Sequence, residues 1–253
     1  MDAQRIGSRG LLCTFDDLLS SEYACLTNIY LIAGERHTFI IDTGLGSAWV
    51  EAALDEFHRR FEFRSPIILT THHHWDHVWG HAAVPEAPVW ATPLCRDFLA
   101  RDGERILKEL AACRRGSASI RLPDVLVESA LDLAEEALTI FPSPGHTPDG
   151  LSVFDRRDKT LVAGDALEWP VPFIDPGPPM PDLETYIATL NRYLHLAPDV
   201  VIASHASPAG LELIAQNLSY LESLRDGTRY EPRGPNDERF DAYHKANLAA
   251  LGR

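Results

Sequence analysis

The chain has 253 residues, of which 45% are hydrophobic and 24% are charged, and its formal net charge is −14 with a sequence pI of about 5.1. This composition is typical of a globular protein, and the length allows a sizeable buried core. The acidic balance argues against a phosphate-backbone binder, which usually presents a basic face, so we expect no nucleic-acid partner.

The first elements that the sequence predicts are a β-hairpin, a helix and two short strands. Residues 27–33 (TNIYLIA) and 38–42 (TFIID) are expected strands, with Gly34 and Glu35 in the turn between them. Residues 48–61 (AWVEAALDEFHRRF) repeat apolar side chains at helical spacing, and Ser47 is the expected N-cap. Residues 66–70 (PIILT) form an apolar run typical of a buried strand, and residues 87–91 predict another.

The rest of the chain continues the mixture of strands and helices. Residues 94–115 have a helical pattern that we expect to break near Gly103, and strands follow at 138–141, 151–154 and 160–163. A Pro-rich loop covers 169–181, and then come a helix near 183–195, a strand at 200–203, a helix near 211–224 and a tail helix at 236–251. With no linker between the halves, this order predicts one layered α/β domain with sheet inside and helices outside.

No segment indicates export or a membrane. The sequence has no run approaching the roughly 18 uncharged apolar residues of a transmembrane helix, and the first residues lack the apolar stretch of a signal peptide. Cys13, Cys25, Cys95 and Cys113 have no CxxC spacing, which favours reduced thiols over a disulfide framework. We therefore expect a cytoplasmic protein without a membrane partner.

Residues 70–81 (TTHHHWDHVWGH) concentrate five histidines and an aspartate directly after a predicted strand. In an extended segment His72 and His74 point the same way and can reach one ion, while Asp76 and His77 can face a second ion. The carboxyl end of a strand is a usual ligand site in α/β sheets. Imidazole and carboxylate ligands suit zinc, with iron or manganese as alternatives.

A purification tag or a solvated loop is the competing interpretation of these histidines, although tags lie at termini and this run is internal. Three further residues favour a metal site. His146, Asp165 and His205 each follow an apolar run and enter a loop rich in glycine or proline. Each is a ligand type delivered to the end of a strand.

The motif His72-His73-His74-Trp75-Asp76-His77, with the later GH, GD and SH pairs, resembles the metallo-β-lactamase-fold hydrolase superfamily, in its hydroxyacylglutathione hydrolase and lactonase branch. The preceding IIDTG, with Asp42 and Gly44, matches another signature of that family. The resemblance covers about residues 28–205. It implies a four-layer αββα sandwich over residues 1–253, with a helical insert around 93–122 and a C-terminal helical tail.

The resemblance also implies two divalent metal ions, zinc in preference to iron or manganese. The first ion would be held by His72, His74 and His146, and the second by Asp76, His77 and His205. Asp165 would bridge both ions, so Asp76 and Asp165 are the expected catalytic residues. Asp42 would orient a ligand by hydrogen bonding instead of binding metal itself.

The implied reaction is hydrolysis of a small thioester, ester or lactone carbonyl by a hydroxide that bridges the two ions. The sequence contains no GxSxG motif for a serine nucleophile. A non-hydrolytic metal-binding protein and an iron-dependent oxidoreductase on the same fold are the alternatives. The expected partner is a small-molecule substrate, and a homodimer is possible.

Several neighbouring residues have two interpretations. We expect His73 to point away from the ligands and His81 to begin or support a helix. Trp75 and Trp79 could line a pocket, but aromatic residues near a strand end more often belong to the core. Trp79 replaces a glycine common in the superfamily, and its bulky ring could reshape the pocket mouth. The loop at 169–181 could form an apolar wall or a plain surface loop. The insert could be a lid or a dimer surface. Its Arg114 and Arg115 could lie at a solvated helix end or contact an anionic substrate.

Overall fold

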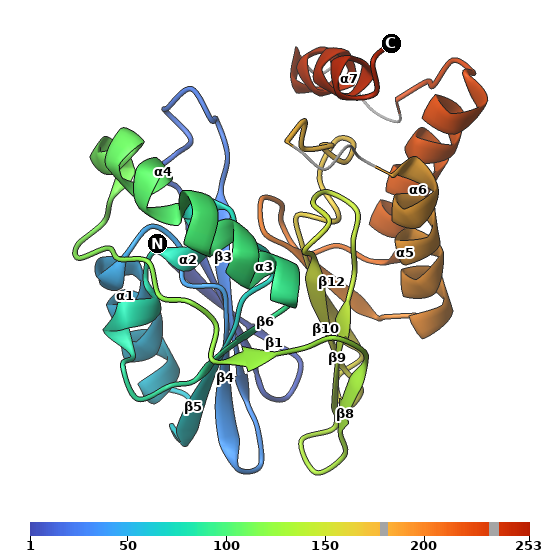
Figure 1. The fold of residues 1–253 in the computed structure, drawn as a ribbon. Coiled ribbons are helices and arrows are strands. Elements are labelled where there is room, and N and C mark those ends of the chain that lie inside the picture. The colour runs from blue at the N-terminus through green and yellow to red at the C-terminus, as the bar shows by residue number, and fades with distance from the viewer. Residues whose placement is uncertain (178–181, 233–237) are drawn as a thin grey trace.

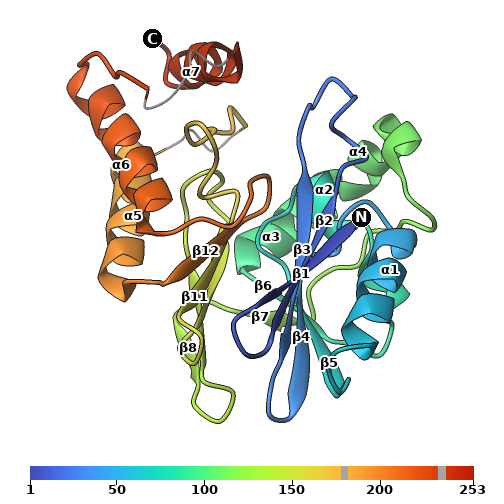
Figure 2. The same ribbon diagram turned by 180° about the vertical axis from the view of Figure 1, so that it is seen from behind.

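Two β-sheets lie face to face, and helices cover the outer face of each (Figures 1 and 2). The computed structural model describes residues 1–177, 182–232 and 238–253. Their arrangement is the αββα sandwich that the sequence predicts. Part of the predicted Pro-rich loop, residues 178–181, and the start of the predicted tail helix, residues 236–237, lie outside the described residues.

The first sheet has seven strands in the order β1-β2-β3-β4-β5-β6-β7. Neighbours are antiparallel from β1 to β4 and parallel from β4 to β7. Its strands are β1 Asp2–Ile6, β2 Gly10–Phe15, β3 Thr27–Ala33, β4 His37–Ile41, β5 Ser65–Leu69, β6 Val89–Ala91 and β7 Val125–Leu126.

The second sheet has five strands in the order β12-β11-β10-β9-β8, of which only the β11–β12 pair is parallel. Its strands are β8 Leu131–Leu133, β9 Leu138–Pro142, β10 Leu151–Asp155, β11 Thr160–Gly164 and β12 Val200–Ala203. The strands of both sheets are rich in buried apolar residues because each sheet has packing partners on its two faces.

Helices of the first half of the chain cover the first sheet, and helices of the second half cover the second sheet (Figure 1). The former are α1 Ser47–His58, α2 Trp75–Val78, α3 Pro93–Phe98 and α4 Glu104–Glu109, with a π-helical turn at Leu99–Gly103 and 3-10 turns at His81–Ala83 and Ala111–Cys113. The latter are α5 Leu183–Leu196 and α6 Leu211–Asp226, while α7 Glu238–Ala250 lies above the loops at one edge of the sheets (Figure 1). None of the helices in the described ranges is long and apolar enough to cross a bilayer.

Three apolar clusters fill the layers between these elements. The central one joins the two sheets through side chains such as Phe39, Leu69, Ile140 and Ile202. The others join each sheet to its helices. Because the sheets are held face to face, the loops that leave their strands at one edge come from both halves of the chain.

Two local predictions were wrong and several short strands were not predicted. Ser47 is the first residue of α1, not its N-cap, because the chain turns at Gly46, whose φ is 143°. The Ser47 hydroxyl instead accepts a hydrogen bond from the Ser117 amide at 3.1 Å. The helical run of the insert does not break at Gly103, since the π-helical turn carries it into α4. Strands β1, β2, β7 and β8 were not predicted.

A buried ion pair connects the two sheets near the β1–β2 turn. The Arg9 guanidinium donates to both carboxylate oxygens of Asp155, at 2.8 and 2.6 Å, and the side chains are 4% and 1% exposed. A charge in such a position is tolerated only while its partner remains, because water cannot replace the partner.

We therefore expect Asp155→Asn to lower the free energy of unfolding by about 3–5 kcal/mol, because the Arg9 charge would stay buried without a counterion. Urea denaturation of the metal-loaded protein measures the change. Glu35→Gln, which removes an exposed partner of Arg157, is the matched control and should leave the midpoint unchanged. Equal midpoints for wild type and Asp155→Asn would contradict this prediction.

Candidate metal centre

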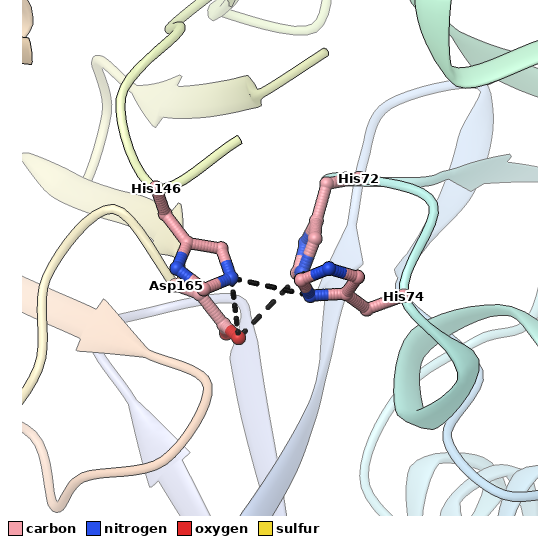
Figure 3. Close-up of side chains that lie close together, drawn as sticks. All are labelled: His72, His74, His146 and Asp165. Carbon is pink, nitrogen blue, oxygen red and sulfur yellow. Dashed lines mark hydrogen bonds and ion pairs between the residues drawn. The ribbon is translucent and has the colours of Figure 1, made fainter. Parts of the chain in front are cut away.

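Four side chains from three loops converge at the edge where the two sheets meet (Figure 3). His72 and His74 follow β5, His146 follows β9, and Asp165 follows β11. His74 Nδ1 lies 2.9 Å from His72 Nε2 and 3.2 Å from His146 Nε2. Asp165 Oδ2 lies 3.6 Å from His72 Nε2 and 3.7 Å from His146 Nε2. These four atoms form a first ligand group.

A second group, Asp76, His77 and His205, adjoins the first. Asp76 and His77 lie on the short helix α2, and His205 follows β12. His205 Nε2 is 3.3 Å from Asp76 Oδ2 and 3.2 Å from Asp165 Oδ2, and His77 Nε2 is 3.5 Å from Asp165 Oδ2. Asp165 therefore faces both groups, and all seven residues expected from the sequence lie together.

The donor atoms of this cluster fit divalent cations. Within each group the candidate ligand atoms lie within 4.8 Å of one another. His77 Nε2 and Asp165 Oδ1 are buried and have no hydrogen-bond partner among the described residues. Buried polar atoms are rarely left unpaired, and imidazole nitrogens and carboxylate oxygens are ligand atoms that suit zinc. This set of residues could bind such divalent ions.

The far side of each histidine ring is fixed by the surrounding chain. His77 Nδ1 lies 2.8 Å from Asp42 Oδ2, and Asp42 in turn accepts from the amide and hydroxyl of Thr71 at 2.8 and 2.7 Å. His146 Nδ1 donates to the Phe173 carbonyl at 2.8 Å, and His205 Nδ1 to the Leu26 carbonyl at 2.7 Å. With Nδ1 protonated, Nε2 of each ring keeps its lone pair for the centre.

Nearby charges keep the Asp165 carboxylate ionised, and burial keeps the rings of His72 and His146 neutral. Burial lowers the pKa of His72 well below its ordinary value and that of His146 to about 4. Burial would raise the pKa of Asp165, but the charges of His205 and His77 hold it well below its usual range. At neutral pH the carboxylate and both neutral imidazoles are therefore in the protonation states that bind metal.

His77 and His205 have the opposite shift in the metal-free chain. Burial would lower the pKa of each ring, but Asp165 and neighbouring carboxylates raise it well above the ordinary value. A cation that binds these rings must displace their protons, so its affinity increases with pH. Glu168, close to the same centre, has its pKa raised to about 7 by burial and by the Asp165 charge.

The other histidines of the 70–81 segment have supporting positions. The ring of His73 faces Asp149, with Nδ1 3.0 Å from Oδ1, and its amide donates to Oδ2 at 2.9 Å. His81 opens a 3-10 turn, and its Nε2 lies 3.0 Å from the Thr70 hydroxyl. Both expectations are confirmed. Asp149, fully buried in the loop after His146, was missed, because in the sequence it reads only as a turn residue.

Of the two interpretations of Trp79, the core position is confirmed, and Trp79 is not among the residues that line the cavity. Trp79 is 1% exposed and belongs to the core between the first sheet and its helices. Its ring lies 5.3 Å from that of Trp75, which does line the cavity above the centre. The next residue, Gly80, has no room for a side chain, because a Cβ there would lie 2.4 Å from the Thr43 carbonyl oxygen.

A cavity of about 250 Å³ opens onto the centre. Beyond five of the candidate ligands it is lined by Tyr23, Cys25, Trp75, Glu168, Phe173 and Tyr243. Phe173 thus forms part of an apolar wall, as the loop prediction suggested, whereas Trp169 is 43% exposed and lines an adjoining cavity of about 390 Å³ that also reaches His205. Tyr23, Cys25, Glu168 and Tyr243 were missed, because nothing in their local sequence marks them.

The insert does not contribute to this cavity, because none of the lining residues lies in 93–122. Arg115 Nε donates to Asp17 Oδ1 at 2.7 Å, and the Arg115 amide donates to the Leu45 carbonyl. Arg115 therefore holds the insert against the loop after β2, and it is not among the residues that line the cavity. Phe98 packs against the ring of His73 at 4.7 Å, so the insert supports the histidine loop from behind.

All four cysteines are free thiols.

The profile of the metallo-beta-lactamase superfamily matches residues 23–205, so the chain belongs to that superfamily. Its members are largely metal-dependent hydrolases. A solved metallo-beta-lactamase from Pontibacter korlensis has the same fold, with a TM-score of 0.69, 20% identity, and coverage of 87% of this chain and 98% of that one.

Three curated relatives have low sequence identity. The probable metallo-hydrolase YflN of Bacillus subtilis is 23% identical over 72% of this chain and 81% of its own length. The human acyl-coenzyme A thioesterase MBLAC2 is 24% identical over 73% of this chain and 75% of its length. The uncharacterized protein YobT of Bacillus subtilis is 28% identical over 56% of this chain, and the match spans 62% of YobT.

We expect metal removal to destabilise the protein. Without a cation, the seven candidate ligands from separate loops would lose the group that pairs with them, and those with like charges would repel one another. Chelation should lower the melting temperature by at least about 5 °C, and added zinc should restore it. Differential scanning calorimetry measures both steps. An unchanged melting temperature in metal-free protein would argue against an assembled metal site.

Asp42→Asn should weaken metal binding about 10- to 100-fold, because the amide no longer fixes the His77 ring with a charged acceptor. Competition with a chromogenic chelator measures the affinity. Asp55→Asn, on the exposed face of α1, is the control and should bind metal as wild type does. Equal affinities for both variants would remove the proposed role of Asp42.

Proposed function

We propose that the chain is a dinuclear hydrolase that cleaves the carbonyl of a small thioester, ester or lactone. The observation that carries this proposal is the convergence of two ligand groups on Asp165 beneath an open cavity. His72, His74 and His146 are the proposed ligands of the first ion, and Asp76, His77 and His205 of the second, with zinc as the proposed metal. The proposed partner is a small molecule, and the proposed compartment is the cytoplasm.

Two divalent ions in these groups, when bound, would lower the pKa of a water between them and polarise a carbonyl. The chain's own residues position that chemistry. Asp165 is presented to both groups after β11, and Asp76 reaches the second group from α2. Asp42 and the carbonyls of Leu26 and Phe173 fix the ring orientations. Pre-organised ligands of this kind need little rearrangement during the reaction.

The lining of the cavity supports an uncharged carbonyl substrate. Trp75, Phe173, Tyr23 and Tyr243 supply aromatic surface, and no lysine or arginine is among the residues that line it. A phosphodiester or a free carboxylate would meet no lysine or arginine in the lining of this cavity, and Arg239 lines the adjoining one. The low similarity to a human acyl-coenzyme A thioesterase favours thioesters as the first compounds to test.

The test is a substrate panel of thioesters, esters, lactones, phosphodiesters and β-lactams with the zinc-loaded protein. We expect hydrolysis of at least one carbonyl class, and Asp165→Ala should lower its kcat/KM about 100-fold or more because both ligand groups lose a shared carboxylate. Asp199→Ala is the matched control, since this aspartate is 69% exposed and far from the centre.

Other outcomes would replace the proposal. Full activity in Asp165→Ala would exclude a reaction that depends on the dinuclear centre. Two bound metals without turnover of any compound would favour a non-hydrolytic metal-binding protein. Bound iron with oxygen consumption would favour the oxidoreductase alternative, and elemental analysis separates that case.

A further inference from the structure

A cavity of about 370 Å³ lies at the other end of the sandwich from the metal centre, and no candidate metal ligand lines it. His72 and His146 follow the carboxyl ends of β5 and β9, whereas Arg36 and Glu136 of this cavity lie in the turns that precede β4 and β9. Both turns are at the bottom of Figure 1. Small-molecule sites in proteins usually measure about 300–1,000 Å³, so this cavity is large enough for a ligand.

The walls of this distal cavity are apolar where it enters the sandwich. Ile67 of β5, Trp90 of β6 and Leu133 of β8 line it, and all three are part of the apolar layer between the two sheets. Ile67 and Trp90 come from the first sheet and Leu133 from the second, so a molecule in the cavity would contact both sheets. The indole of Trp90 offers a flat surface against which an aromatic ring can stack.

The indole nitrogen of Trp90 is a donor without an acceptor. Nε1 is shielded from solvent, and no described residue accepts a hydrogen bond from it. A buried donor that lacks a partner destabilises the folded state, and such atoms are uncommon in proteins. Since Trp90 lines the distal cavity, a bound molecule with an acceptor atom beside the indole would supply the missing partner.

The buried carboxylate of the cavity, Glu136, already has its full set of partners. It accepts from the amides of Glu35 and Arg36 at 2.6 and 3.1 Å, and its Oε1 lies 2.8 Å from His37 Nδ1. Burial would raise the pKa of Glu136, but these hydrogen bonds hold it below the ordinary value. Glu136 therefore ties the β8–β9 turn to the β3–β4 turn and does not call for a cationic ligand.

The exposed charges at the rim are paired with one another as well. Arg36 Nε lies 2.9 Å from Glu135 Oε2, and Asp132 forms an ion pair with Arg156. An anionic ligand would compete with Glu135 for Arg36, and a cationic ligand would compete with the arginines for the carboxylates. Because the walls are apolar and the charges are balanced, the lining favours a molecule without net charge.

We propose that the distal cavity is a second small-molecule site, which binds a neutral compound of one or two aromatic rings that carries a carbonyl acceptor. The ring system lies against Trp90 between Ile67 and Leu133, and the carbonyl oxygen accepts from Trp90 Nε1. The site is separate from the proposed hydrolytic centre, because none of its lining residues is a candidate metal ligand.

The experiment titrates the metal-loaded, ¹⁵N-labelled protein with 1-indanone and with indane, two neutral probes that differ only in a carbonyl or a CH₂ group. The chain has five tryptophans, and the indole N–H signal of Trp90 is the one that Trp90→Phe removes. We expect 1-indanone to shift this signal saturably and to bind about fivefold more tightly than indane, the effect of one hydrogen bond. The cation 1-aminoindane should bind more weakly than 1-indanone.

Trp90→Phe keeps an aromatic wall but removes the donor, so calorimetric titration of this variant should give equal affinities for 1-indanone and indane. Trp169→Phe, in the cavity beside the metal centre, is the matched control and should keep the preference for 1-indanone. A melting curve for each variant verifies folding. If Trp90→Phe does not fold, the two probes on wild type still decide the question.

Three results would overturn the proposal. The first is a Trp90 signal that neither probe shifts up to its solubility limit. The second is equal affinity of wild type for 1-indanone and indane, or a preference that survives in Trp90→Phe. The third is a response confined to the signals of Trp75 or Trp169, which would place the probe at the metal centre instead.

Discussion

The structure depends on the burial of opposite charges at one edge of the two sheets. Asp42, Asp76 and Asp165 are each at most 8% exposed, and the imidazoles of His72 and His77 are equally buried. Separated from water, such groups are stable only when paired with one another or with cations. The unpaired His77 Nε2 and Asp165 Oδ1 show that the protein atoms alone do not complete the pairing. The fold therefore holds the candidate ligand atoms in place before any ion binds.

The frame is rigid because buried amide side chains bind the loop that follows Asp165. Asn217 clamps Glu168, and Asn247 of α7 donates to the Pro172 carbonyl and accepts from the Ile174 amide, both at 2.8 Å. The same loop supplies the Phe173 carbonyl that orients His146. A loop with so few regular hydrogen bonds of its own would otherwise leave its backbone groups unpaired. The second sheet's helices thus position ligands as well as covering apolar surface.

The layered fold and the placement of the seven candidate ligands could be predicted because their signals are local. An apolar strand followed by His72, His146, Asp165 or His205 indicates a strand end, and a superfamily resemblance gives their order. Short strands such as β7 and β8, exposed and only two and three residues long, leave no periodic pattern to detect. The sequence left two interpretations of Trp79 open because its direction depends on α2 packing against the core, which only tertiary contacts determine.

The residues that surround the substrate position differ from the ligands in how they are encoded. Tyr243 comes from the tail helix, Tyr23 and Cys25 from the loop after β2, and Glu168 from a loop whose path depends on Asn217. None comes directly after the last residue of a strand, and none belongs to a recognisable sequence motif. A change in α7 or in the β2–β3 loop can therefore alter the cavity without moving a ligand, because strand ends hold the ligands. The separation allows one metal centre to be combined with different substrates.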